Sequence, residues 1–286
     1  MPTNTKNNLP KPATASPARL LAPLALLIGA LGAGGWWATE SLVVSHTVQE
    51  SRTMADLADN VGRWASQYGG LHARTVGVDA KYPGNFLTSA TFAFSAADGA
   101  LVQGTKLTDT GAEAAAMKRV ETYYWKNPAL IQREVADVIA ASGTPSRYRL
   151  TARTVMNKNN APNAFEIEAL DALQADPDKN EYWVVKGGQM LYARPLVAQK
   201  SCLRCHTSLD KTPEFIRTNA MFNGGGGFGY VEGKPSALIS VTVPLMSPKR
   251  ALTANATPQM WAALGVGALA LVWLLAAMLR PKPPTA

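Results

Sequence analysis

Residues 190–208, MLYARPLVAQKSCLRCHTS, contain both cysteines of this 286-residue chain and one of its three histidines. The pattern within them is Cys202-x-x-Cys205-His206. Two thiols at this spacing can each add to one vinyl group of a porphyrin, and the adjacent imidazole can then bind the iron. The pattern therefore predicts one covalently bound haem c, attached through Cys202 and Cys205, with His206 as the proximal iron ligand.

Three other uses of a Cys-x-x-Cys pair compete with this interpretation. A structural zinc site needs four ligands, and the chain has no second cluster of cysteines and histidines. A thiol–disulfide oxidoreductase places its pair at a helix start in a thioredoxin-like context, whereas the flanking segments here predict antiparallel hairpins. A structural disulfide would close only a very small loop. Haem c is the preferred interpretation, and the other three remain open.

The segments around the pattern predict an antiparallel sheet. A hairpin is expected in residues 181–196, because Gly187 and Gly188 supply the turn between two β-rich runs. Residues 146–154 alternate, which places Arg147 and Arg149 on one face of a strand. Further strands are expected in residues 86–102, with a turn at Asp98 and Gly99, and in residues 230–245.

Helices are predicted in residues 40–70, in residues 111–143 with a break near Pro128, and in residues 160–173. Glycines at positions 69 and 70 end the first helix. Its apolar residues repeat at 3-4-3-4 spacing and form one stripe: Met54, Leu57, Val61, Trp64 and Tyr68. We expect the stripe to pack on its own domain, with a dimer seam as the alternative. Helices and strands together predict one α+β domain over residues 40–257.

Two apolar segments, residues 20–38 and 258–279, flank this domain and contain no charged residue. Each is long enough to cross a hydrocarbon core of about 30 Å as a helix. Trp36, Trp37 and Trp261 lie at their ends, where indole rings favour the membrane boundary. The segments therefore predict two transmembrane helices. For the first, a cleaved signal peptide is the alternative, because basic residues precede it.

Five of the 28 Lys and Arg residues lie in the two tails, residues 1–19 and 280–286, and these tails contain no Asp or Glu. Because basic flanks favour the cytoplasm, we expect both tails inside the cell and the domain in the periplasm, anchored to a bacterial inner membrane. The exported part keeps 23 basic and 20 acidic residues, a net charge of +3. A nucleic-acid partner, which needs a clustered basic face, is not expected.

Four stretches resemble, in their order, a family of bacterial periplasmic c-type haem domains that often precede histidine kinases. They are QYGG (67–70), NAPNAFEIEALDAL (160–173), MLYARPLVAQKSCLRCH (190–206) and GFGYVEGKPSALISVTVP (227–244). The resemblance implies a PAS-like antiparallel sheet, a single covalent haem and a role in sensing. Two departures from the family pattern are a Gly-rich insertion in residues 207–227 and only seven residues after the second span.

The distal iron ligand is less defined. Some members of the family use a cysteine from the N-terminal region, but this chain has no third cysteine. His72, just after the glycines that end the first helix, is the favoured candidate. The alternatives are water or an open position, and the side chains of His46, Met54, Met190 and Met221. Arg194 is expected to bind a haem propionate, because a guanidinium can contact a carboxylate through two N–H groups.

Two functions follow from these expectations. The favoured one is redox or small-ligand sensing by a membrane-anchored haem domain, with a gas as a possible ligand. The alternative is an electron-transfer cytochrome c subunit of a membrane complex. Either role implies a membrane-protein partner, a redox partner or a homodimer. An enzyme is not expected, because the sequence offers neither a nucleophile–base arrangement nor a phosphate-binding loop.

Overall fold

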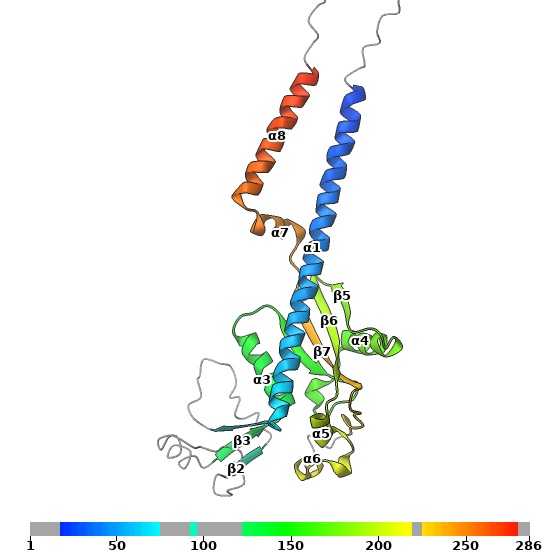
Figure 1. The fold of residues 1–286 in the computed structure, drawn as a ribbon, viewed down its shortest axis with the longest axis vertical. Helices are drawn as coiled ribbons and strands as arrows, with labels where there is room; N and C mark the ends of the chain where they lie inside the picture. Colours follow the sequence, from blue (N-terminus) through cyan, green and yellow to red (C-terminus); the bar gives the residue numbers. More distant parts are fainter. Residues whose placement is uncertain (1–17, 75–91, 96–121, 219–224, 280–286) are drawn as a thin grey trace, which may run out of the picture. The chain divides into compact units, whose positions relative to one another are not determined.

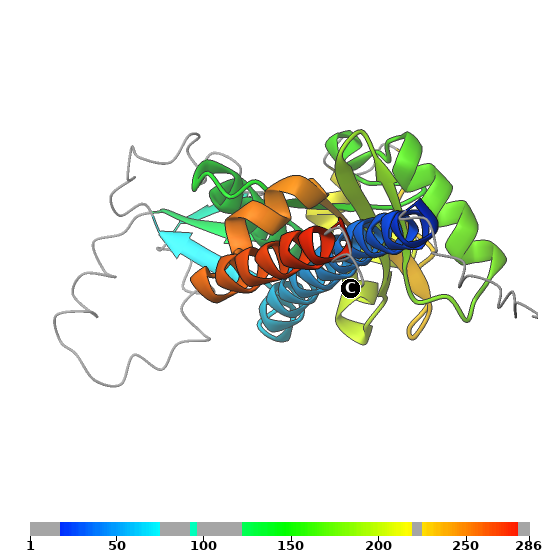
Figure 2. The same cartoon turned by 90° about the horizontal axis from the view of Figure 1, so that it is seen from above.

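The computed structural model describes residues 18–74, 92–95, 122–218 and 225–279. The chain divides into two compact units, a larger one of residues 44–245 and a smaller one of residues 1–43 and 246–286. Their elements can be followed in Figure 1 and, from above, in Figure 2. The predicted α+β class is confirmed, because the larger unit combines helices with a four-stranded antiparallel sheet.

Two helices are long and apolar enough to cross a membrane. One is α1 (Ala18–Gln67), over the range Leu21–Gln67, and the other is α8 (Pro258–Leu279), over Pro258–Ala277. The most apolar part of each has no buried residue. A short helix, α7 (Pro248–Asn255), precedes α8. Two exposed apolar helices are compatible with the expected membrane anchoring.

The main sheet has the strand order β4-β7-β6-β5. Its strands are β4 (Arg147–Thr151), β5 (Tyr182–Lys186), β6 (Gln189–Val197) and β7 (Pro235–Pro244). Gly187 and Gly188 join β5 to β6 with φ angles of 60° and 72°. Two consecutive positive φ angles are typical of a type I′ turn, which glycine adopts without strain. The predicted hairpin is confirmed.

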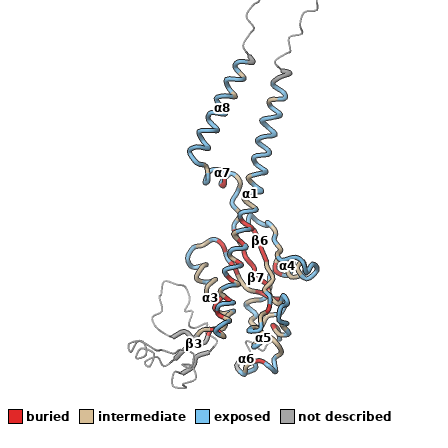
Figure 3. Tube along the Cα trace, viewed as in Figure 1, coloured by how far each residue is buried: buried red, intermediate tan, exposed pale blue. Residues whose placement is uncertain are grey.

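One face of the sheet packs against α1 and against α3 (Pro128–Ala141). Figure 3 shows buried residues concentrated along β6 and β7. The core on this face consists of large side chains from the strands and smaller ones from α1: Tyr148, Met190, Tyr192, Ile239, Val241, Val243, Val48, Ala55 and Ala58. Small residues on α1 allow its backbone to approach the strands closely.

The apolar stripe predicted on α1 is therefore not its buried face. Met54 packs against the core, but Leu57, Trp64 and Tyr68 are 46%, 49% and 65% exposed. The expectation that the stripe packs on its own domain is wrong for these three residues. The buried seam runs beside it at the same spacing, and the close approach of helix and sheet admits only small side chains there.

The second face of the sheet is covered by α4 (Ala164–Ala175). This helix begins with a capping box, in which the Asn163 side chain accepts from the N–H of Glu166 and the Glu166 carboxylate accepts from the N–H of Asn163. Ala169 packs there beside Ala193 and Leu238. The predicted helix is confirmed.

A second, three-stranded sheet corrects one prediction. Its order is β1-β3-β2, with β1 (Leu71–Arg74), β2 (Phe92–Ser95) and β3 (Thr122–Lys126). A helix was predicted where β3 lies, but the TYYW run favours a strand and is paired on both sides. The predicted turn at Asp98 and the start of the helix predicted in residues 111–143 lie outside the described residues.

Two further short helices, α5 (Leu203–His206) and α6 (Glu214–Thr218), lie between β6 and β7 along the chain. Helix α5 follows a 3-10 turn at Lys200–Cys202. The Cys-x-x-Cys-His pattern therefore occupies a compact helical segment directly after a strand of the main sheet.

Candidate haem site

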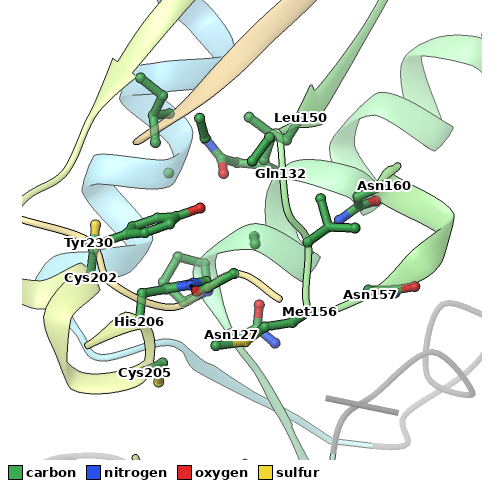
Figure 4. Close-up of a pocket in the computed structure, with 18 of the residues that line it drawn as sticks. Asn127, Gln132, Leu150, Met156, Asn157, Asn160, Cys202, Cys205, His206 and Tyr230 are labelled. Atoms are coloured by element: carbon green, nitrogen blue, oxygen red, sulfur yellow. Dashed lines mark hydrogen bonds between the residues drawn. The ribbon is translucent and has the colours of Figure 1, made fainter. Parts of the chain in front are cut away.

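A cavity of about 610 Å³ lies within the larger unit. Its walls come from α1, the start of α3, the end of β4 with the segment that follows it, and α5 with the segments on both sides of it. Figure 4 shows 18 of the residues that line it. The volume falls within the range of about 300–1,000 Å³ that is usual for ligand and cofactor sites.

The structure brings Cys202, Cys205 and His206 together on the wall of this cavity. Both cysteines are free, half-buried thiols, and Figure 4 shows them at one end of the cavity beside His206. The Gln199 N–H donates to the Cys202 Sγ at 3.4 Å, which orients that sulfur. Burial raises the pKa of the Cys205 thiol above its ordinary value.

The His206 ring is held through one of its two nitrogens. Its Nδ1 lies 2.6 Å from the carbonyl oxygen of Gly227, and because a carbonyl only accepts, Nδ1 carries the proton. The lone pair is then on Nε2. Burial lowers the pKa of His206, which favours the neutral imidazole that metals bind. A ligating histidine usually donates its other ring N–H to a carbonyl or carboxylate, as His206 does here.

Tyr230 forms a further wall beside the imidazole. Its ring stacks on that of His206 with 4.4 Å between the ring centroids and 12° between the planes. The Tyr230 N–H also donates to the backbone carbonyl of His206 at 2.9 Å. The histidine is therefore fixed by a stacked ring as well as by its hydrogen bond to Gly227.

Arg194, predicted to bind a propionate, is not among the described residues that line the cavity. Its guanidinium, on β6, contacts the carboxylate of Asp56 on α1 and lies 3.8 Å from that of Asp59. Among the residues that the structure describes, the arginines that line the cavity are Arg63 on α1 and Arg133 on α3. Arg63 is paired with Asp59 at 3.0 Å.

The distal candidates are placed as follows. The backbone of His72 lies in β1 opposite Trp125, but its side chain and Met221 are outside the described residues. Met190 is fully buried in the main core, and Met54 packs against that core. Neither methionine lines the cavity, and nor does His46, which is exposed on α1.

Sequence reasoning missed three residues of the site, namely Met156, Gly227 and Tyr230. Gly227 and Tyr230 belong to the stretch GFGY, where glycines beside an aromatic residue were the available signal. Met156 also lines the cavity, from the irregular segment between β4 and α4. It had no signal, because that segment shows no periodic pattern.

Comparisons with known proteins bear on the family of the chain. The sequence matches the model of the Tll0287-like family over residues 40–244. Among solved structures, the crystal structure of the cyanobacterial heme-protein Tll0287 is 24% identical, covers 43% of this chain and 74% of its own, and has a TM-score of 0.38. No curated protein matches the sequence.

At that TM-score the solved structure adds nothing about the geometry of the cavity, so the site rests on the residues of this chain. The family match, in contrast, extends over more than half of the sequence. The expected resemblance to a family of c-type haem domains is confirmed at the level of the family. The chain belongs to the Tll0287-like family.

Proposed function

We propose that the larger unit binds one haem covalently through Cys202 and Cys205, with His206 as the proximal iron ligand. One observation carries the proposal: two thiols and an imidazole whose Nε2 is available line the same cavity. Membership of a family whose namesake is a haem protein supports it. When bound, haem supplies a one-electron ferric–ferrous couple and an iron atom that small ligands can reach.

The rest of the cavity suits a porphyrin. Apolar side chains from three separate segments contribute to its walls: Leu150, Leu196 and Ile216. Arg63 and Arg133, the lining arginines, are both exposed, which places positive charge at the edge of the cavity and not inside it. A carboxylate group on a ligand would find a counter-charge at Arg133, whereas Arg63 is already paired with Asp59. For Arg194, propionate binding would require its guanidinium to leave Asp56.

We further propose that the haem serves redox or small-ligand sensing and not catalysis, in a domain anchored to a bacterial inner membrane. Helix α1 supports this role, because one uninterrupted helix contains a candidate span and four residues of the cavity wall: Asp59, Gly62, Arg63 and Ser66. A change at the cavity that displaced α1 would therefore act on the helix that enters the membrane.

Covalent attachment is tested directly. Protein purified from bacterial membranes is expected to keep its haem through acid–acetone extraction and to give a pyridine haemochrome spectrum of the c type. The Cys202→Ser, Cys205→Ser double variant should lose the covalent haem, whereas Ser201→Ala, beside the first thiol, should keep it. Release of the haem from the unsubstituted protein into the organic phase would refute the proposal.

The sensing role is tested by purification from the native membrane with mild detergent. Co-purification with a histidine kinase, a chemoreceptor or another signalling protein is the expected result. Stoichiometric recovery with an oxidoreductase would instead identify an electron-transfer subunit.

A further inference from the structure

We infer that two glycines, Gly226 and Gly227, position His206 and set its strength as a ligand of the haem iron. Both glycines pack closely against the segment Thr154–Met156. The inference rests on the proposed haem site and adds to it the residues that tune the iron. We call Gly226 and Gly227 the glycine pair. It lies at the end of the Gly-rich insertion, between α6 and β7 along the chain.

Gly227 links His206 to the segment after β4 through two hydrogen bonds. Its carbonyl accepts from the His206 Nδ1 at 2.6 Å. Its N–H donates to the Thr154 Oγ1 at 3.3 Å. Thr154 therefore helps to fix the backbone at Gly227. The backbone in turn sets the position of the Gly227 carbonyl and the geometry of its hydrogen bond with the imidazole.

The contact between the glycine pair and this segment leaves no room for side chains. A Cβ on Gly226 would lie 2.9 Å from the carbonyl oxygen of Val155 and 3.0 Å from its nitrogen. A Cβ on Gly227 would lie 2.9 Å from both the nitrogen and the Cγ of Met156. Because these neighbours are largely backbone atoms, they cannot rotate away. A residue larger than glycine must move the loop, and the Gly227 carbonyl moves with it.

Such a movement acts on the iron through the imidazole. A carbonyl that accepts from Nδ1 fixes the tautomer and raises the basicity of Nε2. A more basic ligand stabilises ferric over ferrous iron, and hydrogen bonding to a ligand is one of the means by which proteins adjust haem potentials. Weakening the bond between Gly227 and His206 should therefore raise the midpoint potential.

The test uses the full-length protein, purified in detergent with its haem attached. Gly226→Ala is the main variant, because this residue does not have a positive φ and the change is purely steric. We expect the ferrous-to-ferric ratio at a fixed ambient potential to rise on the order of tenfold, or about 59 mV for one electron. The hyperfine-shifted Nδ1–H resonance of His206 should also exchange faster with solvent deuterium.

Gly233→Ala is the control for a change from glycine to alanine that causes no steric clash. Gly233 has a φ of +77°, close to the +78° of Gly227, but a Cβ there meets nothing within 4 Å. Alanine at position 233 therefore has the strain of a positive φ angle, but it does not displace the glycine pair. Its potential and Nδ1–H exchange should equal those of the unsubstituted protein.

A second pair of variants covers the case in which Gly226→Ala fails to fold. Thr154 is exposed, so its substitution leaves the core intact. Thr154→Val removes the oxygen that accepts from Gly227 and should raise the potential in the same direction, by less. Thr154→Ser keeps the oxygen and should restore the original potential.

The outcomes separate this inference from the proposed function. Absence of covalent haem in the unsubstituted protein would refute the haem site itself. Attached haem with unchanged potential and unchanged Nδ1–H exchange in Gly226→Ala and Thr154→Val would overturn the role of the glycine pair and leave the haem site standing. If only Thr154→Val can be purified, its unchanged potential is sufficient to overturn it.

Discussion

His206 is fixed from two directions before any metal is considered. Its Nδ1 donates to Gly227, and its ring stacks on Tyr230. An imidazole held in this way needs little reorganisation when it binds iron, so little conformational entropy is lost on binding. The proximal side of the proposed site is therefore preorganised.

We predict that His72 is the distal ligand and that the iron is six-coordinate and low-spin. The backbone of His72 is paired with Trp125, two residues before the cavity-lining Asn127. Replacing His72 by alanine should give a high-spin iron, or one that binds exogenous imidazole or carbon monoxide, with the haem still covalently attached. Optical and electron paramagnetic resonance spectra report this change.

His46→Ala is the control for the loss of a histidine, because His46 is exposed on α1 and does not line the cavity. Its spectra should match those of the unsubstituted protein. An unchanged low-spin spectrum in His72→Ala would eliminate His72 and direct the search to Met156, the methionine found on the cavity wall among the described residues.

At the scale of elements, Gln132 connects α3 to its two neighbours. Its side-chain Nε2 donates to the Ala58 carbonyl on α1 at 2.6 Å, and its backbone carbonyl accepts from the Tyr148 hydroxyl on β4 at 2.7 Å. The amide lies over Gly62, where a Cβ would be only 2.1 Å from Nε2. Glycine at position 62 is therefore what admits the Gln132 amide.

Gly62→Ala should consequently destabilise the protein, although alanine is normally the better residue inside a helix by about 1 kcal/mol. Displacing the buried Gln132 amide costs its hydrogen bond and disturbs the packing, so we expect a loss of roughly 1–3 kcal/mol in the free energy of unfolding. Denaturant titration measures this loss. In a double-mutant cycle with Gln132→Ala, additive effects of the two substitutions would contradict the explanation.

The ion pair between Arg52 on α1 and Glu181, next to β5, predicts a pH dependence. Glu181 accepts from Arg52 at 2.6 and 2.9 Å and from the Tyr192 hydroxyl at 3.0 Å. The hydrogen bond from Arg52 lowers the pKa of Glu181 below its ordinary value of 4.5. The ion pair therefore contributes fully to the stability of the folded protein above pH 4.5, and this contribution is lost as the pH falls through the lowered pKa of Glu181.

The contribution is modest and sensitive to salt, because the Arg52 side chain is 45% exposed. Glu181→Gln should lower the melting temperature at pH 7 and make the melting temperature less dependent on pH in the acid range. Asp178→Asn, at an exposed carboxylate in the same turn region, should leave the acid dependence intact. If the melting temperatures of both variants depend on pH in the same way, the acid dependence does not arise from the Arg52–Glu181 ion pair.

Elements with local signals could be predicted from the sequence. The Asn163 cap and the turn at Gly187 and Gly188 each depend on neighbouring residues, and both are found in the structure. Strand β3 was missed although its TYYW run favours a strand, and its pairing with β1 and β2, which are distant along the chain, is what overrides a helix there. Local propensity in the segment before it favoured a helix.

The residues of the site also divide into those with a local sequence signal and those that depend on tertiary packing. Cys202, Cys205 and His206 are close in sequence, so their chemistry could be read directly. Gly227 and Tyr230 reach His206 only after the chain folds back, so the GFGY stretch alone does not indicate which residue they contact. The contact of Arg194 with Asp56 is equally a product of packing between β6 and α1.

At the scale of the whole molecule, we predict that both termini are cytoplasmic and that residues 44–245 are periplasmic. Alkaline phosphatase fused after Ala256, before α8, should be active, and the same enzyme fused after Ala286 should be inactive. A fluorescent protein that folds only in the cytoplasm should give the opposite pattern. Phosphatase activity after Ala286 would overturn the topology, and N-terminal sequencing of the purified protein would reveal removal of the first apolar segment.

The small residues of α1 determine how this helix can move. Between positions 51 and 65 its buried side chains are all small: Ser51, Ala55, Ala58, Gly62 and Ala65. A shear of this stretch along the sheet would move few large side chains, chiefly those of Met54 and, just before the stretch, Val48. Arg194 already faces Asp56 and Asp59, which are about one helical turn apart, so its ion pair survives a short translation. Against a larger movement this contact is held by the hydrogen bond of the Gln132 amide to Ala58 and by the ion pair of Arg52 with Glu181.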